Sequence, residues 1–127
     1  MLDQKAQYIA NIARIMYADD AVADSEEKIL LSLCKQMKVS SKTLPNIKKA
    51  AKKKKSLQPL SRFSKCVSNI EDCFVMALCD GVFDATERKL IFKFAEKVNI
   101  EKKNINRIFS DAAKRLKLDV DNILHEG

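Results

Sequence analysis

The stretch at residues 80–87 reads DGVFDATE, and it separates two segments whose apolar side chains recur at helical spacing. A looser copy, DDAVADSE, occupies residues 19–26, sixty-one residues earlier in the chain. At this offset the first aspartate and the last glutamate of the two copies are identical, and the apolar positions that follow them align. A repeat of this kind indicates two copies of one helix-loop-helix unit that bury a shared core. The sequence therefore predicts two pseudo-repeated halves, at about residues 5–55 and 66–115.

The composition predicts an all-α protein. Among the 127 residues there are only two Gly and two Pro, and Ala, Leu, Lys, Glu and Ile dominate. Such a composition favours helices and disfavours sandwiches and barrels, which need many turns. The length suits one domain with a substantial core. We therefore expect residues 1–127 to form a single compact bundle of about seven helices.

The positions of the helices follow from apolar periodicity and capping signals. The first helix is expected over residues 3–18. Side-chain caps are expected where the second, third, fifth and sixth helices begin, at Asp24, Ser40, Ser68 and Asp84. A short fourth helix is expected near residues 60–67, and a seventh over residues 105–116, after which the tail is expected to add a docked turn.

The helix that leads to the second loop is expected to be the central one, because its side chains are apolar nearly all round. Gly81 follows its last turn and is expected to adopt the left-handed conformation that ends many helices. Asp20 fills the matching place in the first loop, and Asp tolerates this conformation better than most residues.

The chain has the features of a cytoplasmic protein. Its N-terminus lacks a secretory apolar core, and its longest apolar run, residues 73–79, is too short to span a membrane. No pair of cysteines forms a C-x-x-C motif, and each cysteine lies within an apolar helical pattern. We therefore expect reduced, buried thiols rather than zinc ligands or disulfides. The four cysteines are Cys34, Cys66, Cys73 and Cys79.

The second loop is similar to the back half of a calcium-binding helix-loop-helix loop. Asp80, Gly81 and Glu87 would fit positions 5, 6 and 12 of such a loop. Positions 1 and 3, which must supply oxygen ligands, would fall on Met76 and Leu78. An ordinary calcium-binding loop is therefore excluded.

A weaker divalent-metal site remains one of two interpretations of the acidic loops. If the repeat brings the loops together, four carboxylates can converge on one cation: Asp19, Glu26, Asp80 and Glu87. The competing interpretation is that these acids cap helices, because Asp and Asp-x-x-Glu at helix ends satisfy backbone N–H groups. The sequence leaves open whether the two loops are neighbours in space.

The lines MYADDAVADSE at residues 16–26 and MALCDGVFDATE at residues 76–87 resemble the tellurite-resistance TerB-like domain family. The resemblance covers about residues 5–115, and it implies a compact all-α domain from a bacterial protein of the cytosol or the inner membrane surface. It implies a role in the stress response to metal oxyanions, in a complex with another protein. It also implies that the loop acids Asp19, Glu26, Asp80 and Glu87 are the metal ligands.

The net charge of +7 comes from one basic band. Residues 35–65 hold eleven bases and no acid, whereas both loops lie in acidic stretches. The band is lysine-rich and has no aromatic residue between Lys35 and Arg62, so sequence-specific nucleic-acid binding is not expected. Nucleic-acid phosphate and an anionic membrane surface are the two anionic candidates. A membrane surface or an acidic protein partner is favoured over a specific DNA site, and a simple solvated face is the competing interpretation. The candidate contacts are Lys48, Lys49, Lys52, Lys53 and Lys55.

The sequence offers little catalytic equipment. Its only histidine is His125, and it has no Gly-rich phosphate loop, nucleophile elbow or H-E-x-x-H motif. We therefore expect a binding or scaffold domain rather than an enzyme. A hydrolase that uses the loop carboxylates stays as a third hypothesis.

Overall fold

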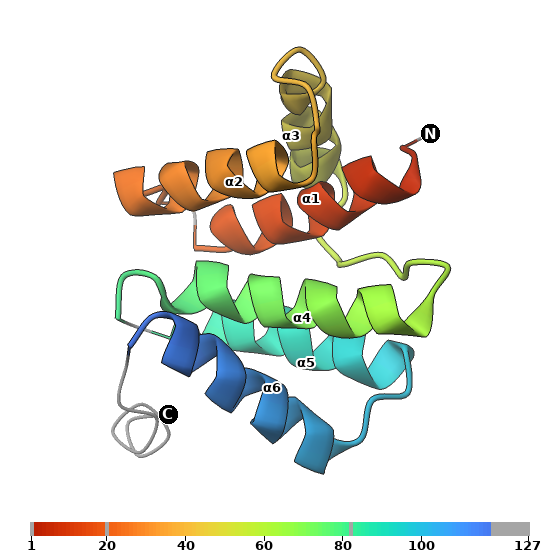
Figure 1. The fold of residues 1–127 in the computed structure, drawn as a ribbon, viewed down its shortest axis with the longest axis vertical. Coiled ribbons are helices and arrows are strands. Elements are labelled where there is room, and N and C mark those ends of the chain that lie inside the picture. Colours follow the sequence, from red (N-terminus) through yellow and green to blue (C-terminus); the bar gives the residue numbers. More distant parts are fainter. Residues whose placement is uncertain (1, 20, 82, 118–127) are drawn as a thin grey trace.

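The computed structural model describes residues 2–19, 21–81 and 83–117, and these residues form six α-helices and no strand. The helices are α1 (Gln4–Met16), α2 (Asp24–Gln36), α3 (Leu44–Lys53), α4 (Phe63–Leu78), α5 (Ala85–Lys97) and α6 (Lys102–Arg115). Figure 1 shows them in two groups, with α1 to α3 in one half and α4 to α6 in the other. The all-α prediction is confirmed, whereas the expected number of about seven helices is wrong for the described residues.

The first helix of each half forms the centre of the molecule. Helices α1 and α4 pack against each other, α1 also packs against α2 and α3, and α4 packs against α5 and α6. Every residue of α1 from Tyr8 to Met16 is buried, as is every residue of α4 from Cys73 to Leu78. The central helix expected from the sequence is therefore real, but α1 shares its role.

The helix count differs because α4 joins two of the expected helices. Ser68 was expected to cap a separate helix, yet it lies inside α4. No Gly or Pro interrupts the chain between Phe63 and Leu78, and Cys66 and Asn69 on either side of Ser68 are both buried. A cap needs non-helical backbone at the capping residue, and packing at these positions favours a continuous helix.

Two other expected caps are displaced, and one is confirmed. Helix α2 has Ala23 at its N-cap, so Asp24 is its first residue rather than its cap. Helix α3 follows Thr43, while the Ser40 hydroxyl accepts a bond of 3.1 Å from the Lys42 N–H in the preceding turn. Asp84 caps α5 as expected.

The remaining local predictions are confirmed in part. Gly81 has a φ of +84°, which confirms the left-handed conformation. All four cysteines are free thiols, and three are buried, but Cys79 is partly exposed. Asp20 and the expected turn of the tail lie outside the described residues. No helix in the described part of the chain has the length and apolar character needed to cross a bilayer.

Candidate functional site

The two acidic loops are neighbours in space. Both follow the C-terminal ends of the central helices, α1 and α4, and they emerge at the same end of the molecule in Figure 1. The Cys79 Sγ, just before the second loop, lies 3.8 Å from the Ser25 Oγ, just after the first loop. The parallel packing of α1 and α4 therefore brings together two acidic segments that are sixty-one residues apart in sequence.

The second loop positions Glu87 through a reciprocal cap. The Asp84 carboxylate accepts a bond of 2.8 Å from the Thr86 N–H at the start of α5. Glu87, at the third helical position, accepts a bond of 3.2 Å from the Asp84 N–H. These bonds satisfy N–H groups that have no partner within the helix. They also hold the Glu87 side chain back against the protein, where it is only 3% exposed.

The first loop holds Glu26 in the same position with half of this arrangement. Glu26 is at the third position of α2, is 5% exposed, and accepts a bond of 2.9 Å from the Ala23 N–H. Ala23 replaces the capping aspartate, and its methyl group cannot accept a bond in return. In both loops, the glutamate thus bonds the N–H three residues before it.

The other two predicted ligands occupy a more exposed level of the site. Asp19 and Asp80 are exposed, and one Asp19 oxygen accepts a bond of 3.2 Å from the Ala21 N–H. Of the four predicted carboxylates, the two aspartates are therefore exposed to solvent and the two glutamates are buried.

Burial and mutual repulsion make the two glutamates weak acids. Burial is the largest cause and raises the pKa of Glu87 from 4.5 to about 8, against the lowering effect of the Asp84 N–H. Repulsion from Asp19, Asp84 and Glu26 raises this pKa further. The pKa of Glu26 is also raised, first by burial and then by Asp19 and Asp80, although the Ala23 N–H lowers it. Each loop thus disfavours the charged carboxylate of the other loop.

Among the described residues, no three His, Cys, Asp or Glu side chains are grouped so that they could hold a metal ion. What the structure brings together is a set of carboxylates that oppose one another's ionisation. A proton or a cation would relieve this repulsion.

The five candidate lysines of the basic band lie on α3 and on the segment that follows it, but their surroundings differ. The Lys48 ammonium bonds both Glu27 oxygens at 3.0 and 3.1 Å. The Lys52 ammonium lies 4.9 Å from the centroid of the Tyr17 ring. Lys49, Lys53 and Lys55 are exposed and make no ion pair with a described carboxylate. Four of the five lysines are therefore available to an anionic partner, since Lys52 is exposed as well.

Sequence reasoning missed a buried polar network that joins the two halves. The Asn11 amide of α1 donates to the Asn69 side-chain oxygen of α4 at 2.7 Å and to the Gln58 carbonyl at 2.9 Å. The Asn11 oxygen accepts from the Gln58 N–H at 2.9 Å and from Arg14 at 2.7 Å. Asn11 interrupts the apolar face of α1, and this interruption was the available signal, because buried amides are normally hydrogen-bonded.

The chain was compared with protein-family models, curated proteins and solved structures. The model of the family described as tellurite resistance protein TerB matches residues 5–110. No curated protein matches the chain, and no solved structure does.

Proposed function

Because this chain belongs to the TerB family of tellurite resistance proteins, we propose that it is a non-enzymatic binding domain whose paired acidic loops take up a divalent cation. We place it in a bacterial stress response to metal oxyanions, in the cytoplasm or at the inner membrane surface, in complex with another protein. The observation that carries the proposal is the pair of buried glutamates with raised pKa values, Glu26 and Glu87.

A bound cation would lower the repulsion between the carboxylates of the two loops. Two buried carboxylates that repel each other are stabilised by a positive charge placed between them or beside them. Oxygen ligands of this kind suit Ca²⁺, Mg²⁺ or Mn²⁺. The exposed Asp19 and Asp80 would be the first ligands that an incoming ion meets, and the buried glutamates would complete the site after a shift of the loops.

The matching positions of the two glutamates also support the interpretation of the chain as two repeated units. Each follows a loop that links a central helix to an outer one, and each bonds the N–H three residues before it. We infer that the duplication is the reason why each loop supplies one aspartate and one glutamate to the proposed site.

The experiment is a titration of the chelator-stripped protein with Ca²⁺, Mg²⁺, Mn²⁺ and Zn²⁺, in which the melting temperature is measured at each ion concentration. Binding to the folded state raises this temperature. A rise for one ion that is lost in Asp80→Asn and in Glu87→Gln supports the proposal. Asp111→Asn, an exposed acid of α6, is the matched control and should keep the rise. No rise with any ion would leave the loop acids as helix caps. Turnover of an ester, phosphate or nucleotide by a homogeneous sample would contradict the non-enzymatic role.

A second candidate function is favoured by the exposed lysines. We propose that Lys49, Lys52, Lys53 and Lys55 attract an anionic membrane surface or an acidic protein partner. Lysine contacts of this kind weaken steeply as salt is added. The test is sedimentation with phosphatidylglycerol vesicles at increasing salt. Lys49→Gln/Lys53→Gln should lower retention, whereas Lys89→Gln/Lys93→Gln, an equally exposed pair on α5, should not. Absence of retention at low salt would reject the membrane surface as the partner of these lysines.

A further inference from the structure

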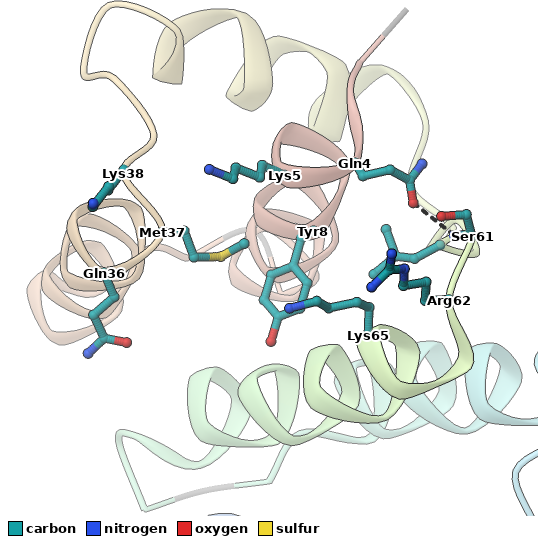
Figure 2. Close-up of a pocket in the computed structure, with 10 residues that line it drawn as sticks. Gln4, Lys5, Tyr8, Gln36, Met37, Lys38, Ser61, Arg62 and Lys65 are labelled. Carbon is teal, nitrogen blue, oxygen red and sulfur yellow. Dashed lines mark hydrogen bonds between the residues drawn. The ribbon is translucent and has the colours of Figure 1, made fainter.

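A cavity of about 480 Å³ lies at the other end of the central helices, away from the acidic loops (Figure 2). It is bounded by the start of α1, the end of α2 and the segment that leads into α4. Its volume falls within the range of small-molecule sites. Since α1 spans roughly 20 Å at 1.5 Å per residue, this cavity is separate from the loop site.

The inner wall of the cavity is apolar. Tyr8 of α1 and Leu60 are 6% and 8% exposed, and the half-buried Met37 faces them from the end of α2. In Figure 2, the thioether of Met37 and the ring of Tyr8 border the same space. The Tyr8 hydroxyl is already used, because it donates to Asp72, which Arg115 holds at 2.8 Å. The wall therefore offers a surface for an apolar group rather than a vacant polar partner.

The rim of the cavity is cationic. Four basic side chains from three parts of the chain stand around it, and the lining contains no carboxylate. None of the four makes an ion pair with an acid of the described residues. In Figure 2, Lys5, Arg62 and Lys65 lie around Tyr8, whereas Lys38 stands beyond Met37 with its side chain directed away from Tyr8. The four are Lys5, Lys38, Arg62 and Lys65.

The backbone adds to this positive potential. Helix α4 begins at the edge of the cavity with no acidic residue in its first turn and no side-chain cap on its N–H groups. The positive end of its dipole therefore reinforces Arg62 and Lys65.

We propose that this cavity binds an acidic amphiphile, with its carboxylate or phosphate head at the cationic rim and its alkyl chain along the apolar wall. A small inorganic anion would leave the wall formed by Tyr8, Met37 and Leu60 in water. A neutral apolar molecule would gain nothing from the four cations at the rim. A single ligand that carries both features matches the whole cavity, and its source is either a free monomer or a lipid in a membrane.

The first test is calorimetric titration of the full chain with dodecyl phosphate below its micellar concentration. We expect saturable binding with one site, and amide chemical shift changes centred on Tyr8, Met37 and Lys65. Inorganic phosphate and the neutral dodecyl maltoside are the comparison ligands, and both should bind at least about tenfold more weakly. Equal binding of either one would overturn the proposal, because the site would then recognise only half of the ligand.

Variants locate the site. Arg62→Gln/Lys65→Gln should weaken dodecyl phosphate by about tenfold or more, because two exposed cations at the head-group position are removed. Met37→Glu, at a half-buried position, should abolish binding while circular dichroism stays helical. Lys89→Gln/Lys93→Gln should leave binding unchanged. Unaltered affinity in both cavity variants would overturn the proposal.

Phosphatidylglycerol vesicles distinguish the two sources of the ligand. If the vesicles retain the protein and Arg62→Gln/Lys65→Gln lowers this retention, the ligand is a membrane lipid. If the protein binds monomeric dodecyl phosphate but the variant does not change its retention on vesicles, the ligand is a free amphiphile. Absence of binding to both would overturn the proposal. Because neither ligand contains a metal ion and both are tested with chelator present, a failure here is independent of the outcome at the acidic loops.

Discussion

Glu26 and Glu87 lie sixty-one residues apart in the chain, yet each is buried at the third position of a helix, and the charge of Glu26 raises the pKa of Glu87. Each accepts a hydrogen bond from the backbone N–H three residues before it. As caps, these side chains stabilise α2 and α5. As neighbouring buried acids, they oppose each other's ionisation. This repulsion should make the loops sensitive to protonation, and it is the basis of the proposed cation site.

Glu87 should make the stability of the protein depend on pH. Its pKa is about 8 in the folded state and near 4.5 when unperturbed, so the folded state binds more protons between these values. The free energy of unfolding should therefore fall as the pH rises from about 4.5 to about 8, and this contribution should be constant above that window. Urea unfolding at a series of pH values measures this slope.

Glu87→Gln should flatten that slope, because the amide oxygen can still accept the Asp84 N–H but cannot ionise. Glu101→Gln, an exposed acid that makes no cap bond, should keep the slope of the unaltered protein. A slope that is the same in all three proteins would contradict the raised pKa of Glu87.

Gly81→Ala should destabilise the protein by about 1 kcal/mol, because the φ of +84° is unfavourable for residues with a Cβ. No atom lies within 4 Å of the position that the added Cβ would occupy, so the cost comes from the backbone alone. Gly81→Asn should cost less, since Asn tolerates this conformation better. Chemical denaturation of the two variants checks the order, and a more stable Ala variant would exclude the left-handed turn.

Asn11→Ala should destabilise the protein by about 3 kcal/mol, because it leaves several buried polar groups without partners. Those groups belong to Arg14, Gln58 and Asn69, and they come from both halves of the molecule. Asn104→Ala, at an exposed position of α6, should change stability by less than about 0.5 kcal/mol. Equal effects of the two substitutions on the urea midpoint would show that the network contributes little.

Phe74→Ala should destabilise the protein by about 3–5 kcal/mol, since it opens a cavity in the second half. Phe74 is fully buried, and its ring centroid lies 5.2 Å from Phe109, 5.8 Å from Phe83 and 6.4 Å from Phe92. Phe63→Ala removes the same side chain at an exposed position and should have little effect. Thermal unfolding compares the pair, and a small loss for Phe74→Ala would contradict its place at the centre of this cluster.

The sequence predicted best the features that depend on a few consecutive residues. The cap at Asp84 with Glu87, the turn at Gly81 and the apolar faces of the helices all follow from local chemistry. The local signal failed at Ser68, where a plausible cap lies inside a continuous helix because its neighbours Cys66 and Asn69 pack in the core. Tertiary packing overrode capping there, since burial of a helix face outweighs one hydrogen bond.

The sequence by itself determined the all-α class, the apolar faces and the acidic character of both loops, because periodicity and residue type act over one or two helical turns. Only the tertiary structure decided that the loops are neighbours, that Glu26 and Glu87 are buried near acids of the other loop, and that Asn11 reaches Asn69. It alone assembled the cavity from α1, α2 and α4. These are contacts between residues far apart in the chain, and the packing of α1 on α4 sets them.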